Sequence, residues 1–177
     1  AIDSTHNENV LTFYGQGGIG KSRIALAMAR ANVLGIPFCG FSTGTEPLRH
    51  LFIGSENDLH RWKHDMLQMT RGLDAEQIGR LDECVLVTTL EAVNDAFIGL
   101  SEDNRDKWRA TLAEHRPDVL WVDQWGDCID GDSLSDRDVR ATLATLRTLA
   151  REASPDCGIV IIAHARTGAS NLVQAVG

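Results

Sequence analysis

The sequence predicts an α/β fold in which a mostly parallel sheet lies between two layers of helices, a three-layer sandwich. Two observations support this fold class. Short apolar segments alternate along the chain with longer segments of helical periodicity, and most of these short segments lack the polar alternation of a half-exposed strand. Strands that are apolar on both faces need helices on both sides, and strand–helix alternation is typical of parallel sheets. With 177 residues, the chain has the length of about one domain.

Five strands are predicted, each a short apolar run bounded by turn residues or by a helical segment. They are residues 10–14, 50–54, 84–87, 118–123 and 158–163. The first run, VLTFY, ends in a glycine cluster, which is typical of a buried strand that enters a tight loop. The fourth run is apolar up to an acid at its tip, and the fifth is followed by a histidine and, two residues later, an arginine.

Four helices are predicted between these strands from apolar residues at three- and four-residue spacing. They are residues 22–34, a helix that starts at Asn57 or Asp58, residues 103–115, and a helix behind Ser135. Gly35 and Pro117 stop the first and the third helix. Ser135 and Asp138 have the spacing of a capping box at the start of the fourth. The Gly- and Asp-rich segment 125–132 is expected to be a loop.

A glycine-rich octapeptide follows the first strand directly and matches the pattern GxxxxGK[ST] in full. Its residues are Gly15, Gln16, Gly17, Gly18, Ile19, Gly20, Lys21 and Ser22. The glycines allow the backbone to curl so that its N–H groups point at phosphate oxygens, and the following helix adds the positive end of its dipole. In such a loop Lys21 reaches the β- and γ-phosphates and Ser22 holds Mg²⁺. The sequence therefore predicts a site for ATP and Mg²⁺, although no motif that reads the base accompanies it.

The acid at the tip of the fourth strand is Asp123. A strand-end aspartate by itself is often only a turn residue. After a phosphate loop, however, an acid at this place is typical of the Walker B carboxylate, which orients Mg²⁺ and its waters. We therefore expect Asp123 to share the metal site with Ser22.

Two further polar residues follow strands of the predicted sheet. Glu56 comes after the second strand and His164 after the fifth, and ligands of open α/β sheets lie at the carboxyl ends of strands. A carboxylate at position 56 either orients the attacking water or caps the helix that begins near Asp58. His164 either hydrogen-bonds the γ-phosphate and reports its loss to the next segment, or is an ordinary strand-end imidazole.

At these positions the chain resembles the RecA-like ATPases, and most closely the hexameric replicative helicases of the plasmid RepA type. The resemblance rests on the phosphate loop, on Glu56 in the segment GSEN, on Asp123, and on the segment AHARTGA at residues 163–169. It extends from residue 10 to about residue 169. The phosphate loop is by far the most specific of these four motifs.

The resemblance implies a role for each matching residue. Glu56 would be the general base for attack by water, Asp123 the Walker B acid, and His164 the sensor of the γ-phosphate. Lys21 would act on the phosphates during catalysis. Single-stranded DNA would be the partner of a homo-oligomeric, hexameric ring, with Arg166 as a phosphate or DNA contact.

The chain departs from the family pattern near the sensor. Where that pattern tends to read His-His-x-x-Lys, this sequence has Ala163 and Thr167, with Arg166 beside them. The family's arginine finger comes after the fifth strand and would lie beyond residue 177. Residues 1–177 are therefore expected to be one RecA-like ATPase domain that ends before its C-terminal strands.

Charge and hydropathy restrict the partners. A formal charge of -8 argues against broad, field-driven binding to nucleic acid or to acidic membranes. No apolar run approaches the roughly 18 residues of a membrane span, and the first residues lack the pattern of a signal peptide. A cytoplasmic protein that binds no membrane is expected.

The predicted function is ATP hydrolysis by the motor core of a replicative helicase or single-stranded-DNA translocase. The alternative is an ATP-dependent switch or a recombination or repair mediator without motor activity. A small-molecule kinase is less favoured because such enzymes usually carry an Arg-rich lid, whereas the arginines of the last predicted helix lie opposite its apolar face. A partition ATPase would have lysine in place of Gln16, and neither the LSGGQ motif of ABC ATPases nor the NKxD motif of small GTPases occurs.

Overall fold

The computed structural model describes residues 10–55, 59–88 and 99–164. In this part of the chain, five parallel strands form one sheet in the order β1-β5-β4-β2-β3. The strands are β1 (Val10–Gly15), β2 (His50–Gly54), β3 (Val85–Thr88), β4 (Val119–Asp123) and β5 (Gly158–His164). The helices are α1 (Lys21–Val33), α2 (Leu59–Met69), α3 (Ala75–Cys84), α4 (Arg105–His115) and α5 (Asp136–Ala153), with the short 3-10 helices η1 (Glu102–Asn104) and η2 (Trp125–Cys128).

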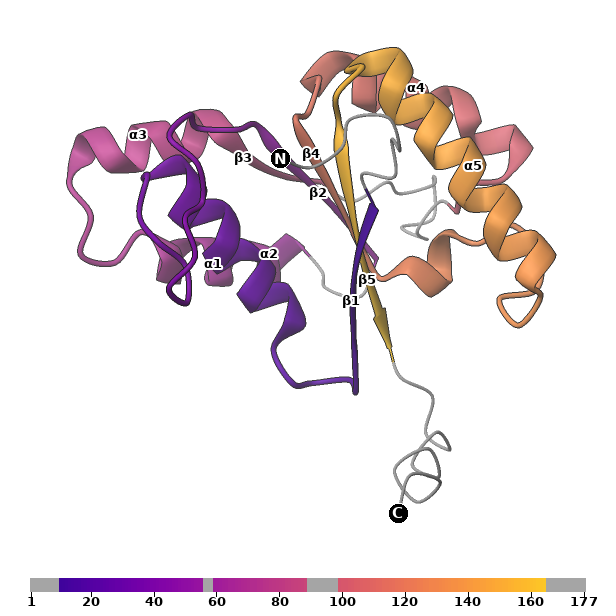
Figure 1. Ribbon diagram of the computed structural model, residues 1–177, viewed down its shortest axis with the longest axis horizontal. Helices are drawn as coiled ribbons and strands as arrows, with labels where there is room; N and C mark the ends of the chain where they lie inside the picture. Colours follow the sequence, from indigo (N-terminus) through magenta and orange to yellow (C-terminus); the bar gives the residue numbers. More distant parts are fainter. Residues whose placement is uncertain (1–9, 56–58, 89–98, 165–177) are drawn as a thin grey trace.

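Helices cover both faces of the sheet, with α1, α2 and α3 on one side and α4 and α5 on the other (Figure 1). Side chains of the central strands alternate between the two layers, as the two-residue period of a strand requires. The α4–α5 side takes up Leu51, Ile53, Leu120, Val122, Ile159 and Ile161. The α1–α3 side takes up Phe52, Trp121, Val160 and Ile162. The predicted α/β class with strands apolar on both faces is therefore confirmed, and the arrangement is that of a RecA-like P-loop NTPase core.

The strand order brings the candidate site residues together at the carboxyl ends of the strands. β5 lies between β1 and β4, so its carboxyl end emerges between the phosphate loop and Asp123. The pairing register sets His164 opposite Gly15, and Asp123 opposite Gly54 of β2. Segments that are more than 100 residues apart in the sequence thus meet at the carboxyl ends of parallel strands, where ligands of open α/β sheets bind.

β1 differs from the expectation of a buried strand. It is one of the two edge strands of the described sheet, and Leu11 and Tyr14 are exposed to 52% and 63%. Phe13 is partly buried and stacks on Trp121 at a centroid distance of 6.2 Å. The apolar sequence of this strand predicts β structure correctly, but it does not reveal that β5 alone pairs with it among the strands of residues 10–55, 59–88 and 99–164.

Helix α3 is not among the elements that the sequence predicts. It begins with a complete capping box, in which Asp74 Oδ1 accepts from the N–H of Gln77 at 2.8 Å and Gln77 Oε1 accepts from the N–H of Asp74 at 3.2 Å. Only Leu81 of this helix is buried, and Ile78 and Leu81 are its only large apolar residues, so little apolar sequence marks it as a helix. Cys84 ends α3 and does not begin β3.

Two smaller expectations also change. The segment after Asp123 is not a plain loop, because η2 buries Trp125 to 6% exposure against the core. The predicted capping box of α5 forms only in part. Ser135 Oγ accepts from the N–H of Asp138 at 3.4 Å, but the Asp138 carboxylate accepts from the N–H of Asp132 instead. An aspartate is one methylene shorter than the glutamate of a full capping box.

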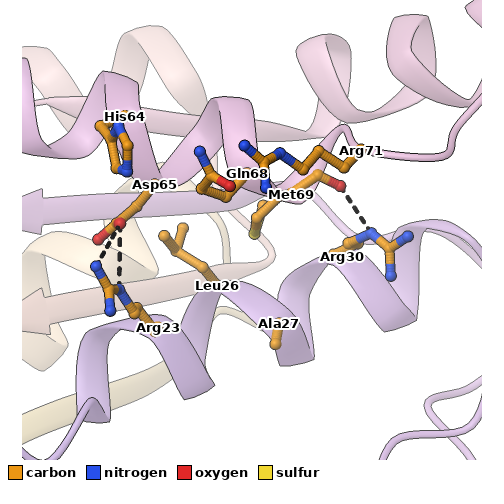
Figure 2. Close-up of a pocket in the computed structure, with 9 residues that line it drawn as sticks. All are labelled: Arg23, Leu26, Ala27, Arg30, His64, Asp65, Gln68, Met69 and Arg71. Atoms are coloured by element: carbon orange, nitrogen blue, oxygen red, sulfur yellow. Dashed lines mark hydrogen bonds and ion pairs between the residues drawn. The ribbon is translucent and has the colours of Figure 1, made fainter.

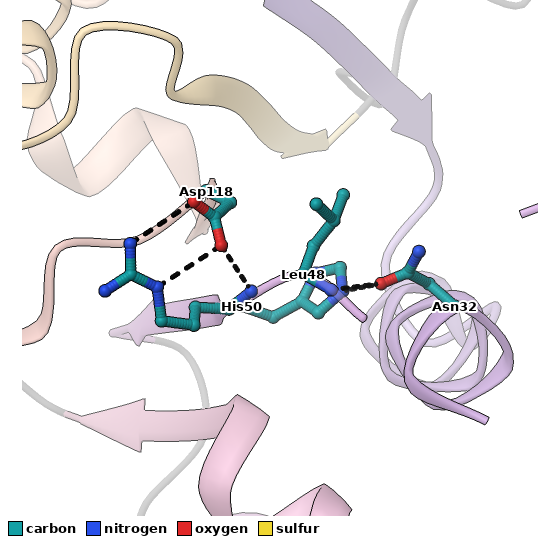
Figure 3. A network of polar contacts seen from close by, with 5 residues as sticks. Asn32, Leu48, His50 and Asp118 are labelled. Carbon is teal, nitrogen blue, oxygen red and sulfur yellow. Dashed lines mark hydrogen bonds and ion pairs between the residues drawn. The ribbon is translucent and has the colours of Figure 1, made fainter. Parts of the chain in front are cut away.

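At the amino end of β2, the buried side chain of His50 joins α1 to β4, and Figure 3 shows its contact with Asn32 of α1. His50 is 4% exposed, and its Nε2 lies 3.1 Å from Asn32 Oδ1. Its Nδ1 accepts from the indole N–H of Trp121 at 3.1 Å. Nδ1 therefore carries no proton, and Nε2 donates to Asn32. Burial lowers the pKa of His50 from 6.5 to about 4, against a smaller opposing effect of Asp118. The imidazole is neutral in the folded protein at pH 7.

We expect stability to fall as the pH is lowered from about 6.5 to 4. In this range the unfolded chain binds a proton at His50 that the folded protein does not, so each pH unit favours unfolding by about 1.4 kcal/mol and the whole window by about 3 kcal/mol. Above pH 6.5 this effect is absent. Urea unfolding of the wild type and of His50→Gln at pH 7 and pH 4.5 measures it. The variant should lose distinctly less stability than the wild type, and equal losses would contradict the assignment.

Candidate functional site

The phosphate loop connects the end of β1 to the first turn of α1. Gly18 and Gly20 have φ values of 75° and 90°, in the left-handed region that favours glycine. Gly20 is the N-cap of α1, and its carbonyl accepts from the N–H of Ile24 at 3.0 Å. The glycine spacing of the sequence motif therefore has the conformational reason that was expected. The loop leads directly into the N-terminus of a 13-residue helix, whose dipole favours an anion there.

Lys21 is the first residue of α1 and is only 7% exposed. Its Nζ donates to the carbonyl oxygens of Gly15 and Gln16, at 3.0 and 2.8 Å. The ammonium group therefore ties the beginning of the loop to the start of the helix. This places a buried positive charge within the loop, as the binding of a triphosphate requires.

Ser22 and Asp123 lie in direct contact. Ser22 Oγ donates to Asp123 Oδ2 at 2.5 Å, and Asp123 is 1% exposed at the end of β4. A hydroxyl and a carboxylate oxygen are hard ligands of the kind that Mg²⁺ takes from proteins. Mg²⁺ keeps several waters and usually needs only one or two protein ligands beside phosphate oxygens. The donor set thus fits Mg²⁺, although the described residues contain no cluster of three or more His, Cys, Asp or Glu side chains that could hold a metal.

Hydrogen bonds of Ser55, the residue after β2, join the end of this strand to the end of β4. The N–H of Ser55 donates to the carbonyl of Asp123 at 2.7 Å, and Ser55 Oγ donates to Asp127 Oδ2 at 2.6 Å while accepting from the N–H of Gln124 at 3.1 Å. The peptide bond between Asp123 and Gln124 is cis. Glu56, the predicted general base, is the next residue along the chain and lies outside the described residues. The hydrogen bonds of Ser55 were not foreseen from the sequence.

His164 lies beside the phosphate loop. A methyl group on Gly17 would lie 3.5 Å from His164 Cε1 and 3.6 Å from Nδ1. The imidazole is therefore in contact range of the loop backbone, where a sensor of bound phosphate would have to be. Arg166, the predicted phosphate or DNA contact, lies outside the described residues.

A cavity of about 260 Å³ opens between the phosphate loop, His164 and the helix α2. Three further charged residues line it, namely Arg23, Arg61 and Asp65, and none of them belongs to the four sequence motifs. Arg61 and Asp65 are four residues apart, which in a sequence resembles an ordinary surface ion pair on one helix face. Only the packing of α2 against α1 shows that this pair faces the phosphate loop.

A larger groove of about 600 Å³ runs between α1 and α2 next to this cavity (Figure 2). It shares Arg23 and Asp65 with the cavity and is also lined by Arg30 and Arg71. Arg30 Nε donates to the carbonyl of Met69 at 2.9 Å, which joins the far ends of the two helices. The protein is acidic as a whole, but its charge in this region is locally positive.

In the described residues, no helix is long and apolar enough to cross a membrane. No curated protein matches the chain. The family model described as AAA domain matches residues 6–170, which include the phosphate loop, Asp123 and His164. The chain therefore belongs to the AAA domain family of P-loop ATPases.

Proposed function

We propose that this protein is an Mg²⁺-dependent ATP hydrolase with its active site at the carboxyl edge of the sheet. The observation that carries the proposal is the hydrogen bond between Ser22 of the phosphate loop and Asp123 of β4. It joins two oxygen ligands for Mg²⁺ directly beside the buried ammonium group of Lys21. A glycine turn alone would need neither the buried acid nor the buried lysine.

In the proposed reaction the loop backbone and Lys21 bind the phosphates of ATP. Ser22 and Asp123 would hold Mg²⁺, which would supply positive charge to neutralise the phosphate oxygens. Glu56 orients the attacking water and accepts its proton. His164 senses whether the γ-phosphate is present and passes this state to the segment that follows it. The protein supplies mainly positioned charge, since phosphoryl transfer has a loose transition state with little covalent chemistry for side chains to perform.

The proposed task is translocation on single-stranded DNA by a homo-oligomeric ring, as in the hexameric replicative helicases of the plasmid RepA type. It is supported by the resemblance of the four motifs to those of RepA-type helicases. Arg166, two residues beyond His164, would contact phosphate or DNA. Through His164, ATP hydrolysis would change the conformation of the following segment, which would bind the single-stranded DNA.

A nucleotide-dependent switch without motor activity is the second candidate. It is favoured by the charge of -8, because a translocase concentrates basic residues where it binds the DNA backbone. In such a protein, slow ATP hydrolysis would cause the protein to exchange one binding partner for another and would not drive movement along DNA. A small-molecule kinase would differ from both, because it would transfer the phosphoryl group to an acceptor other than water.

ATP turnover with and without single-stranded DNA, combined with light scattering for size, distinguishes these functions. A ring whose phosphate release rises several-fold with DNA supports the motor. A monomer whose slow turnover ignores DNA excludes the motor and supports the switch. The Lys21→Ala variant provides the control, because turnover that persists at the wild-type rate in this variant would not come from this site.

A further inference from the structure

Three charged side chains from two helices meet at the phosphate-binding cavity and take no part in the reaction described above. Arg23 Nε of α1 donates to Asp65 Oδ1 at 3.2 Å, and Arg23 Nη2 lies 3.1 Å from the same oxygen. Arg61 Nε of α2 donates to Asp65 Oδ2 at 3.1 Å. Each oxygen of the carboxylate is therefore engaged by a different guanidinium group. Figure 2 shows how Arg23 reaches across from α1 to Asp65 on α2.

The carboxylate is buried and the guanidinium groups are not. The side chain of Asp65 is 8% exposed, whereas those of Arg23 and Arg61 are exposed to 58% and 52%. Burial raises the pKa of Asp65, but the hydrogen bonds and charges of Arg23 and Arg61 outweigh this and hold the pKa below its ordinary value. Asp65 is therefore ionised at neutral pH, and the three side chains together carry a net charge of +1.

The three side chains lie where their positive charge can act on a bound phosphate group. All three residues line the same cavity as Lys21 and Ser22. Arg23 directly follows Ser22 in the first turn of α1, and Arg61 lies on the helix that follows Glu56 in the sequence. A triphosphate on the loop would therefore lie between a positive side chain from α1 and one from α2.

We propose that Asp65 is a positioning residue that holds Arg23 and Arg61 at the cavity, where their guanidinium groups bind the phosphates of the nucleoside triphosphate. The inference rests on the proposed function, because it assigns further ligands to the same site. Arginine suits this role because its planar group donates two parallel hydrogen bonds to phosphate oxygens. Without the carboxylate, two guanidinium groups near the ammonium of Lys21 would repel one another.

The first test compares ATP binding by calorimetry at constant Mg²⁺ and salt. Arg23→Gln and Arg61→Gln should each weaken binding about tenfold or more, as expected for the loss of a charged hydrogen bond. Arg61→Lys should recover only part of the affinity, because it keeps the charge but cannot donate two parallel hydrogen bonds. Arg80→Gln is the matched control, since Arg80 forms an ion pair with Glu76, four residues earlier on α3 and away from the cavity. This variant should bind ATP like the wild type.

The second test separates positioning from mere stability. Asp65→Asn should weaken ATP binding several-fold in the wild-type background and have no further effect when Arg23 and Arg61 are both glutamine. Thermal unfolding without nucleotide controls for folding in every variant. If Asp65→Asn weakens binding equally in both backgrounds, or tightens binding in the wild type, the positioning role is overturned.

The outcomes also separate this inference from the proposed function. If the wild type does not bind ATP, or if Lys21→Ala binds it equally well, the proposed function itself is wrong. If binding requires Lys21 while Arg23→Gln and Arg61→Gln both bind like Arg80→Gln, only the inference about the cluster is wrong.

Discussion

Lys21→Ala is expected to reduce ATP turnover at least about 100-fold and to weaken ATP binding, while the fold remains intact. The ammonium group is buried within the phosphate loop and is the positive charge nearest to the loop carbonyls of Gly15 and Gln16. Alanine removes this charge where negative charge develops on the transferred phosphoryl group, and a water-excluding site makes the loss large. The two carbonyl groups lie at the surface end of β1 and can be hydrated instead, so only a small loss of stability is expected.

Phosphate release and nucleotide binding, measured beside thermal unfolding, check this result. Lys107→Ala is the matched control, because Lys107 is an exposed lysine of α4 in the opposite helix layer. It should turn over ATP at the wild-type rate. A Lys21→Ala protein that is folded and hydrolyses ATP normally would show that the glycine-rich loop is not the catalytic phosphate site.

Asp123→Asn is expected to lower Mg²⁺-dependent turnover by a comparable factor, about 100-fold or more. Asparagine has nearly the same shape and its carbonyl oxygen still accepts a hydrogen bond from Ser22, but it lacks the negative charge that holds and orients Mg²⁺. Because Asp123 is 1% exposed, a neutral group there costs less desolvation than a carboxylate. Stability should therefore be unchanged or slightly increased. A loss of activity without a loss of stability distinguishes a metal ligand from a structural residue.

The measurement is turnover as a function of Mg²⁺ concentration, with Asp118→Asn as the control at the opposite end of the same strand. Asp118 pairs with Arg49 at 3.3 Å and lies at the amino end of β4, away from the phosphate loop (Figure 3). Its variant should retain the wild-type dependence on Mg²⁺. Equal behaviour of the two variants would remove Asp123 from the metal site.

Much of the fold could be predicted because it is encoded locally. The period of apolar residues distinguishes strands from helices, and the glycine spacing of the phosphate loop reflects the left-handed backbone of Gly18 and Gly20. Asp123 could be proposed from the sequence because an acid at the end of an apolar strand that follows a phosphate loop is typical of the Walker B carboxylate. Helix α3 has only two large apolar residues, Ile78 and Leu81, too few to mark a helix by themselves, yet its capping box at Asp74 and Gln77 was a readable signal.

By itself, the sequence determined the α/β class, the phosphate loop and the strand ends at which the proposed site residues lie, because each of these depends on neighbours within a few residues. Only the tertiary structure decided that β5 lies between β1 and β4, that β1 is an edge strand, and that Ser22 meets Asp123. It also decided that Asp65 gathers two arginines at the phosphate cavity. These features arise from strand pairing and helix packing between distant segments, and no local pattern records which segments will meet.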